Sequence, residues 1–349
     1  MRLPAALLAL LALLGAPALA RGDGVAAPPA APAAPVSAPA SPLLLGEFPL
    51  ADGGGVVDGD TIRVMKDGAS TPVRILGLDA EETFHGRKGD AERQRAEADF
   101  DAYSKEMRGT SPLPVKYATP AGLAAREFAL QFFAGVKTVR LERDEVGRDA
   151  DGFGRLLMHV FAAKDGKERL FAEDLIQAGL SPYFVKYGRS KRYDARFAAA
   201  TKEAQERKRG VFGDAVHHYP DYPQRLLWWE ERAKQVDAWD AETAASPAAV
   251  ARVRLGVAAE TDRLPALLGK RVTLFASLDR VDDEGWPKRL LFVDKPHEPF
   301  AVVVFDEKAW AALDLPAIRA RYSRIAGTLS EYRGHLQLKL ESPADLSTR

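Results

Sequence analysis

Two short stretches decide the fold and the chemistry of this chain. The first is Val57-Asp58-Gly59-Asp60-Thr61, and the second, residues 74–83, is Arg-Ile-Leu-Gly-Leu-Asp-Ala-Glu-Glu-Thr. Together they hold five carboxylates and one arginine around two strand-like runs, and a second arginine, Arg155, follows later. Carboxylates can bind a hard divalent cation, arginines can grip a phosphate through two hydrogen bonds, and a free glutamate can activate water. The chain therefore carries the groups needed to hydrolyse a phosphodiester.

Each stretch has a simpler interpretation when it is taken alone. Aspartate and glycine are common turn residues, so the Asp58-Gly59-Asp60 run is equally typical of a turn with solvated carboxylates. The combination favours a site, because two acidic clusters lie at the ends of neighbouring strand-like runs and Arg74 lies between them.

Composition sets limits on the rest of the chain. Its 349 residues are enough for two domains with connecting segments. The formal net charge is zero, so attraction to nucleic acid has to come from a local patch. There is no cysteine, which excludes disulfides, thiolate metal sites and cysteine nucleophiles.

The N-terminal segment has the pattern of an export signal. Arg2 precedes an apolar run that is short for a membrane span, and residues 18–20 fit a small-x-small cleavage site. We expect residues 1–20 to be a signal peptide cut after Ala20, which predicts a secreted or periplasmic protein without a stable membrane span; the alternative is an uncleaved N-terminal anchor. Residues 21–45 are rich in alanine and proline and predict a linker.

A first domain is predicted over residues 46–213 and a helical connector over residues 214–250. In the first domain, residues 66–68 (Lys-Asp-Gly) are a turn signal between two strand-like runs. The predicted strands are residues 55–65, 71–78, 137–142 and 155–162, and the predicted helices are residues 87–107, 120–133, 170–179 and 192–209.

A second domain is predicted over residues 251–349. Its predicted elements are strands at 271–278, 290–293 and 300–305, a helix at 307–322, and strands at 323–329 and 335–340. Three strands, a helix and two strands are the element order of the oligonucleotide/oligosaccharide-binding (OB) barrel. This second barrel either binds nucleic acid or serves only for packing.

The first domain resembles the staphylococcal nuclease (thermonuclease) family. Asp58–Thr61 match its Asp-Gly-Asp-Thr motif, and Arg74, Asp79 and Glu82 match its Arg-x₄-Asp-x₂-Glu spacing. Phe153-Gly154-Arg155 stands where the family has Tyr-Gly-Arg. The resemblance implies an OB-fold-type five-stranded β-barrel with helices. With the second, C-terminal OB-like barrel, the fold class expected for the chain is mainly β with α (α+β).

The resemblance also implies roles for individual residues. Asp60, Asp79 and the carbonyl of Ala80 would bind Ca²⁺, Arg74 and Arg155 would bind the scissile phosphate, and Glu82 would position or deprotonate the attacking water. Asp58 would support this arrangement without binding the metal. The remaining substrate contacts implied are Phe153, Tyr183, Lys186 and Tyr187.

The sequence departs from the family pattern in several places. Ala80 replaces a threonine, Phe153 replaces a tyrosine, and Glu81 replaces a proline, which makes Glu81 an alternative to Glu82 as the catalytic base. Residues 87–116 are longer than in the family and fall beside the active-site loop. His85 is either a metal ligand or, more simply, a solvated loop histidine.

These observations predict an exported Ca²⁺-dependent nuclease that hydrolyses DNA and/or RNA. A catalytically inactive nucleic-acid-binding or envelope scaffold protein is the alternative. Protein partners cannot be predicted from the sequence.

Overall fold

A tight hairpin brings the two acidic stretches together. In the computed structural model, which describes residues 41–164, 166–245, 251–295 and 297–349, β2 (Thr61–Lys66) pairs antiparallel with β3 (Ala69–Ile75). Asp67 and Gly68 both have positive φ, 51° and 76°, as a two-residue hairpin turn requires. The register places Thr61 opposite Arg74, so the Asp-Gly-Asp-Thr motif lies beside the arginine.

The first barrel consists of strands β1–β5. Its sheet order is β1-β4-β5-β3-β2, and Leu50, just after β1, bridges Val64 of β2, so that the order returns to its first strand. The β3–β5 pair is parallel, and β6 adds to β5. The other strands of this region are β1 (Leu44–Pro49), β4 (Thr138–Glu142), β5 (Leu156–Lys164) and β6 (Lys167–Leu170).

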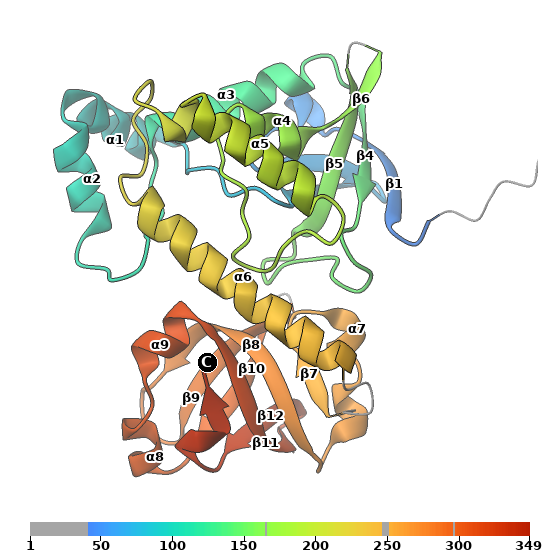
Figure 1. The fold of residues 1–349 in the computed structure, drawn as a ribbon. Coiled ribbons are helices and arrows are strands. Elements are labelled where there is room, and N and C mark those ends of the chain that lie inside the picture. Colours follow the sequence, from blue (N-terminus) through green and yellow to red (C-terminus); the bar gives the residue numbers. More distant parts are fainter. Residues whose placement is uncertain (1–40, 165, 246–250, 296) are drawn as a thin grey trace, which may run out of the picture. The chain divides into compact units, whose positions relative to one another are not determined.

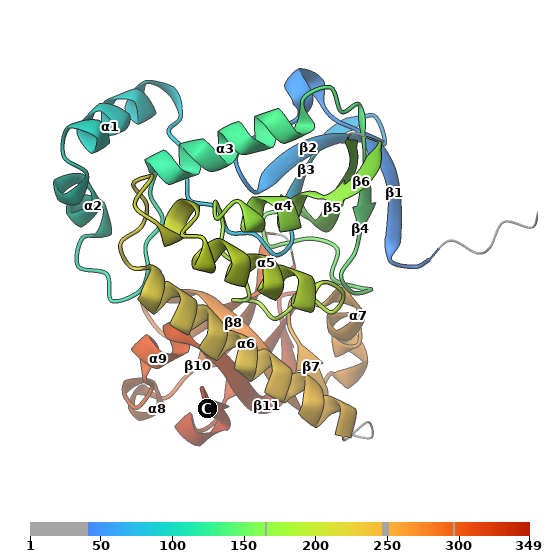
Figure 2. The ribbon, with the colours of Figure 1, turned by 45° about the horizontal axis from the view of Figure 1, so that its top comes forward.

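Helices fill the long connections of this barrel. Thr119 caps α3 by accepting a hydrogen bond from the Gly122 amide, and Pro120 begins the helix, a pattern typical of helix starts. In both ribbon views α1 and α2 lie beside α3 (Figures 1 and 2), and Ala96, Phe100 and Ala121 share a small apolar cluster there. The helices are α1 (Gly86–Ala98), α2 (Phe100–Arg108), α3 (Pro120–Phe133), α4 (Phe171–Gln177) and α5 (Asp194–Glu206).

The second barrel consists of strands β8–β12 and is closed. Pairing runs β8-β9-β10-β12-β11 and back to β8, with a parallel β10–β12 pair, which is the OB-fold order. Its elements are β8 (Arg271–Asp282), β9 (Lys288–Lys295), β10 (Glu298–Val304), α8 (Glu307–Ala311), α9 (Leu315–Ala320), β11 (Tyr322–Tyr332) and β12 (His335–Leu340), with β7 (Arg252–Arg254), α7 (Ala258–Thr261) and β13 (Leu346–Ser347) alongside.

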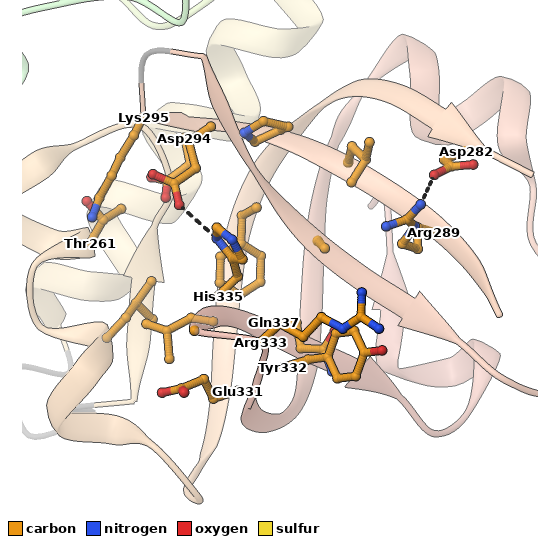
Figure 3. Close-up of a pocket in the computed structure, with 18 of the residues that line it drawn as sticks. Thr261, Asp282, Arg289, Asp294, Lys295, Glu331, Tyr332, Arg333, His335 and Gln337 are labelled. Carbon is orange, nitrogen blue, oxygen red and sulfur yellow. Dashed lines mark hydrogen bonds and ion pairs between the residues drawn. The ribbon is translucent and has the colours of Figure 1, made fainter.

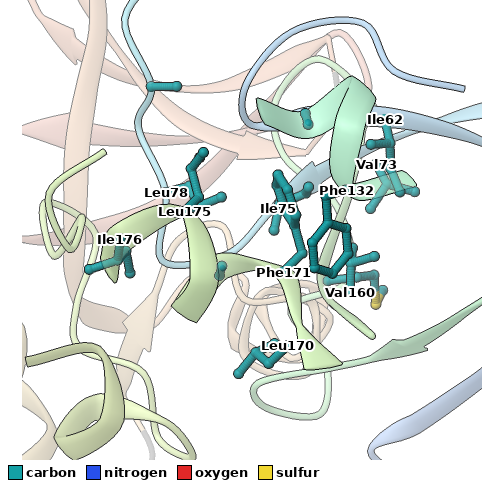
Figure 4. Packing of buried hydrophobic residues seen from close by; sticks show 14 of the residues in the cluster. Ile62, Val73, Ile75, Leu78, Phe132, Val160, Leu170, Phe171, Leu175 and Ile176 are labelled. Atoms are coloured by element: carbon teal, nitrogen blue, oxygen red, sulfur yellow. The ribbon is translucent and has the colours of Figure 1, made fainter. Parts of the chain in front are cut away.

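The long helix α6 (Tyr222–Ala245) packs against both barrels. Trp229 and Ala233 belong to the core of the first barrel, part of which is drawn in Figure 4, whereas Val236 and Trp239 pack with Phe275 of β8. Residues 41–349 accordingly form one compact unit.

The predicted fold class is confirmed, with differences in detail. The predicted helix over residues 307–322 is two short helices, because Asp314 caps a new start ahead of Pro316. Residues 87–107 are likewise divided, because Asp99 caps α2. The predicted signal peptide lies outside the described residues. Among the described helices, none combines the length and apolar character needed to cross a membrane.

Candidate active site

Close backbone packing shapes the turn that carries Asp60. Asp58 Oδ1 accepts a hydrogen bond from the Asp60 amide at 3.1 Å, which folds the chain back before β2. A Cβ on Gly59 would lie 2.6 Å from Cβ of Ala125, so only glycine lets α3 approach this turn. Asp58 is thus a turn residue in the structure, as expected for a supporting role.

A cluster of opposite charges lies at the end of the hairpin. Arg74 Nη1 is 2.5 Å from Asp60 Oδ1, and Arg74 Nη2 is 2.6 Å from Asp79 Oδ1 and 3.0 Å from the Leu78 carbonyl. The Ala80 amide donates to Asp60 Oδ2 at 3.0 Å. The structure therefore joins four of the predicted site residues directly: Asp60, Arg74, Asp79 and Ala80.

Burial governs the electrostatics of this cluster. Asp60 and Asp79 are only 2% and 7% exposed. Burial raises the pKa of Asp60 to about 7, an effect that exceeds the opposing effect of Arg74. Burial acts on Asp79 in the same direction, but Lys116 and Arg74 outweigh it and hold the pKa of Asp79 below its ordinary value.

Lys116 is a member of the cluster that sequence reasoning missed. Its Nζ lies 2.6 Å from Asp79 Oδ1 and 3.6 Å from Glu82 Oε1. Lys116 ends the segment that is longer than in the resembled family, and no periodic pattern marks it. This longer segment thus brings a second cation, besides Arg74, to the carboxylates.

The structure separates the two adjacent glutamates. Glu81 is buried: it accepts hydrogen bonds from the Tyr219 amide at 2.9 Å and from the Thr119 hydroxyl. The Glu82 side chain is 47% exposed and faces Lys116. Glu81 is therefore a buried hydrogen-bond acceptor that holds neighbouring segments together. Glu82 is the glutamate that faces the cluster.

Close contact with α3 also fixes the backbone at Glu82. The Thr119 amide donates to the Glu82 carbonyl at 3.0 Å, and a Cβ on Gly122 would lie 2.0 Å from that oxygen. Gly122 thus allows the first turn of α3 to seat against the glutamate that faces the cluster.

Arg155 is paired with an aspartate of its own turn. It lies in the 151–155 turn, where its Nε donates to Asp151 Oδ2 at 2.8 Å and its guanidinium lies 5.6 Å from the centre of the Phe153 ring. Phe153 is 75% exposed. The parallel β3–β5 pair places Arg74 opposite Leu157, two residues after Arg155, so the 151–155 turn leads directly into the strand beside Arg74.

Known proteins match the same region. Residues 72–214 match the family described as Staphylococcal nuclease homologue. The chain carries a staphylococcal nuclease homologue domain. It is 29% identical over 160 residues to a thermonuclease of Staphylococcus hyicus, covering 46% of this chain and 73% of that protein. It is also 27% identical over 157 residues to an uncharacterized protein of Methanocaldococcus jannaschii, covering 45% and 68%. These similarities support a nuclease-type function and a nucleic acid substrate.

The predicted substrate residues of the nuclease domain differ in their surroundings. Tyr183 is buried, and its hydroxyl donates to Asp194 and accepts from the Ser190 amide. Tyr183 therefore has a structural role in its loop. The Lys186 ammonium lies 4.3 Å from the centre of the Trp228 ring, and Tyr187 is 39% exposed.

The cluster offers a hard cation only a small donor set. The described residues contain no group of three or more His, Cys, Asp or Glu side chains arranged to hold a metal. The carboxylates of Asp60 and Asp79 are oxygen donors, which suit Ca²⁺. Both cations near Asp79 bind Oδ1, and Oδ2 accepts no hydrogen bond from the described residues. The side chains thus fit a weakly held Ca²⁺ that water and substrate phosphate would complete.

The second barrel has a groove of about 960 Å³ beside β9 and β10 (Figure 3). Seven carboxylates and four lysines or arginines line it. Three of its basic side chains are paired: Arg280 with Asp279, Arg289 with Asp282, and His335 with Glu298. Phe292 of β9 is fully buried and cannot stack on a base. A net acidic groove with paired cations is poorly suited to phosphate.

Proposed function

We propose that this protein is an exported, Ca²⁺-dependent nuclease that hydrolyses phosphodiester bonds of DNA and/or RNA. One observation carries the proposal: Arg74 lies between two buried carboxylates in the nuclease domain, and Glu82 stands exposed at the edge of the same cluster. Burying charges costs several kcal/mol per ion, so such a cluster is retained at a cost to stability.

The side chains would divide the reaction between them. Asp60, Asp79 and the Ala80 carbonyl would hold Ca²⁺, which when bound supplies positive charge to the phosphate. Arg74 would donate two hydrogen bonds to phosphate oxygens as their charge grows in the transition state. Glu82 would take the proton of the attacking water. Arg155 would bind the same phosphate.

The leaving group follows from the family resemblance. Attack in line with the 5′ oxygen breaks the phosphorus–oxygen bond on that side. The products would then carry a 3′ phosphate and a 5′ hydroxyl.

A direct assay tests this proposal. Purified protein is incubated with single-stranded DNA, duplex DNA and RNA, in Ca²⁺ or in excess chelator. We expect cleavage in Ca²⁺ and its loss in chelator. Full activity in chelator would refute the metal site, and cleavage by the Arg74→Lys variant at the wild-type rate would refute the phosphate contact.

The engagement of Arg155 by Asp151 favours a second candidate, a nucleic-acid-binding scaffold without catalysis. That candidate predicts nucleic-acid binding with steep salt dependence and no cleavage under any metal condition. Export is tested separately, by sequencing the N-terminus of the mature protein, which we expect to begin after Ala20.

A further inference from the structure

Two loops of the nuclease domain carry the predicted substrate contacts. Loop A, residues 143–155, connects β4 to β5 and holds Phe153 and Arg155. Loop B, residues 178–193, connects α4 to α5 and holds Lys186 and Tyr187. Both loops contact parts of the chain that lie C-terminal to the nuclease domain.

Some of these contacts are made to the loop backbones, and the Arg189 and Lys191 side chains of loop B also pair with acidic residues of α6. In loop A, the Gly147 carbonyl accepts from the Ala258 amide at 2.6 Å and the Gly152 carbonyl accepts from the His297 amide at 2.9 Å. In loop B, the Lys186 carbonyl accepts from Arg232 Nε at 3.3 Å, and the Tyr187 carbonyl accepts from Arg254 Nη2 at 3.0 Å. Four carbonyls are thus held, while the exposed Phe153 and Tyr187 side chains remain accessible.

Arg232 of α6 is the most strongly enclosed of these donors. It is 1% exposed, and besides the Lys186 carbonyl it donates to Ser277 Oγ of β8 at 2.8 Å and to the Ala320 carbonyl at 3.3 Å. Its guanidinium lies 4.3 Å from the centre of the Tyr322 ring. A buried arginine is costly unless its donors are satisfied, and here it is satisfied by bonding loop B and the second barrel at once.

We propose that α6 and the second barrel are a positioning part of the nuclease site, with Arg232 and Arg254 fixing loop B and the Ala258 and His297 amides fixing loop A. The inference rests on the proposed function. In this role the second barrel orders the substrate loops and does not itself bind phosphate. Such a role is compatible with its acidic groove. Arg232 acts through Lys186 and Tyr187 and is a positioning residue.

The test uses the full chain and two point variants. Arg232→Met keeps the aliphatic stem and removes the donor to the Lys186 carbonyl of loop B. Ala258→Pro removes the donor to Gly147 at the first residue of α7, where proline is tolerated. Val302→Ala, which removes two methyl groups from the second barrel's core far from either loop in sequence, is the control for general destabilisation.

Hydrogen exchange measures how firmly the loop amides are protected, and it needs no assay of activity. We expect the Gly188 and Ser190 amides, which are hydrogen-bonded in loop B, to exchange about tenfold faster in Arg232→Met, as the loss of roughly 1.4 kcal/mol of hydrogen bonding predicts. Ala258→Pro should speed exchange in loop A instead. Val302→Ala should change neither loop selectively. Equal changes in all three variants, or none, would overturn the proposal.

Kinetics connects the loops to the reaction. On a short single-stranded oligonucleotide in Ca²⁺, we expect Arg232→Met to raise KM about tenfold and to change kcat only a few-fold. Combining it with Lys186→Ala should raise KM by less than the product of the separate effects. An unchanged KM in Arg232→Met would refute positioning. If the wild type cut no nucleic acid, the proposed function would fail, whereas the exchange result would still decide whether the loops are held.

Discussion

The first barrel holds Asp60, Asp79 and Arg74 almost out of water at the end of its β2–β3 hairpin. In the second barrel, by contrast, Ser323 is the only polar side chain that is buried in the described strands β8–β12, and charged residues such as Arg289 and Asp282 pair near the surface. Both barrels have the same strand order, with helices between the third and fourth strands and a parallel pair of third and fifth strands.

The difference supports placing the proposed chemistry in the first barrel. Strand order alone cannot explain buried charge, since the second barrel closes with an apolar core. Removing an ion from water costs several kcal/mol, so a fold that needs only stability has no reason to bury Asp60, Asp79 and Arg74 together. The shared architecture therefore provides a scaffold, and the site is identified by its side chains.

The largest expected effect tests whether the two barrels are independent. Trp229 of α6 is fully buried in the first barrel's core, although it lies outside the nuclease domain. We expect Trp229→Ala to lower the free energy of unfolding by about 3–5 kcal/mol. Leu227→Ala, on the exposed side of the same helix, should change it by less than about 0.5 kcal/mol. Similar small losses in denaturant titrations of both variants would show that α6 is dispensable.

The next effect compares one arginine from each barrel. Arg74→Lys should slow cleavage by on the order of 10² or more, because lysine cannot reproduce the two-pronged contact to phosphate. Arg289→Lys, at the exposed pair with Asp282 in the second barrel's groove, should leave the rate unchanged. Comparable losses of kcat/KM in the two variants would place the groove in the substrate path.

A smaller effect separates buried from exposed carboxylates within the first barrel's site. Glu81→Ala leaves the Tyr219 amide and the Thr119 hydroxyl without their acceptor, so we expect a stability loss of about 1–3 kcal/mol. The folded protein should still cleave at a rate within a few-fold of the wild type. Glu82→Ala should leave the melting temperature unchanged. A severe loss of turnover in Glu81→Ala would mean that Glu81 is the base.

The smallest effect concerns pH. His159 of β5 is fully buried, its Nε2 lies 2.9 Å from Asp144 and its Nδ1 has no described partner, and burial lowers its pKa. The folded state therefore favours neutral imidazole, so its contribution to stability is present above the ordinary pKa of about 6.5 and is lost as pH falls.

Two histidine variants isolate this contribution. Denaturant midpoints measured between pH 7.5 and pH 5 should show a smaller pH-dependent loss in His159→Gln than in the wild type. His335→Gln, at an exposed pair in the second barrel, should keep the wild-type pH dependence. Identical pH dependence in all three proteins would refute the assignment to His159.

The sequence predicts the main site because its parts are local. Asp60 directly precedes Thr61, which pairs with Arg74 in the hairpin, and Asp79 follows Arg74 by five residues. Motif spacing alone therefore brings both carboxylates to the same arginine. The alternation of apolar runs and turn residues likewise predicts the order of strands and helices in each barrel. The structure brings predicted residues together where those residues are close in sequence or lie on paired strands.

Long-range contacts were not predictable in the same way. β1 carries weak strand character and is held by pairing to β4, some ninety residues later, so its start at Leu44 falls inside the predicted linker. Lys116 and Arg232 reach their partners only through tertiary packing. A buried arginine on a helix has no sequence signal that distinguishes it from a solvated one.

The central claim is that the buried charge cluster of the first barrel is the nuclease site, with Glu82 as its base. The most direct measurement compares Glu82→Gln with the wild type in Ca²⁺, measuring cleavage and binding of the same labelled oligonucleotide. Loss of a general base predicts a fall in turnover of about 10²–10⁴-fold with binding within a few-fold of the wild type. Wild-type turnover in Glu82→Gln would contradict the account.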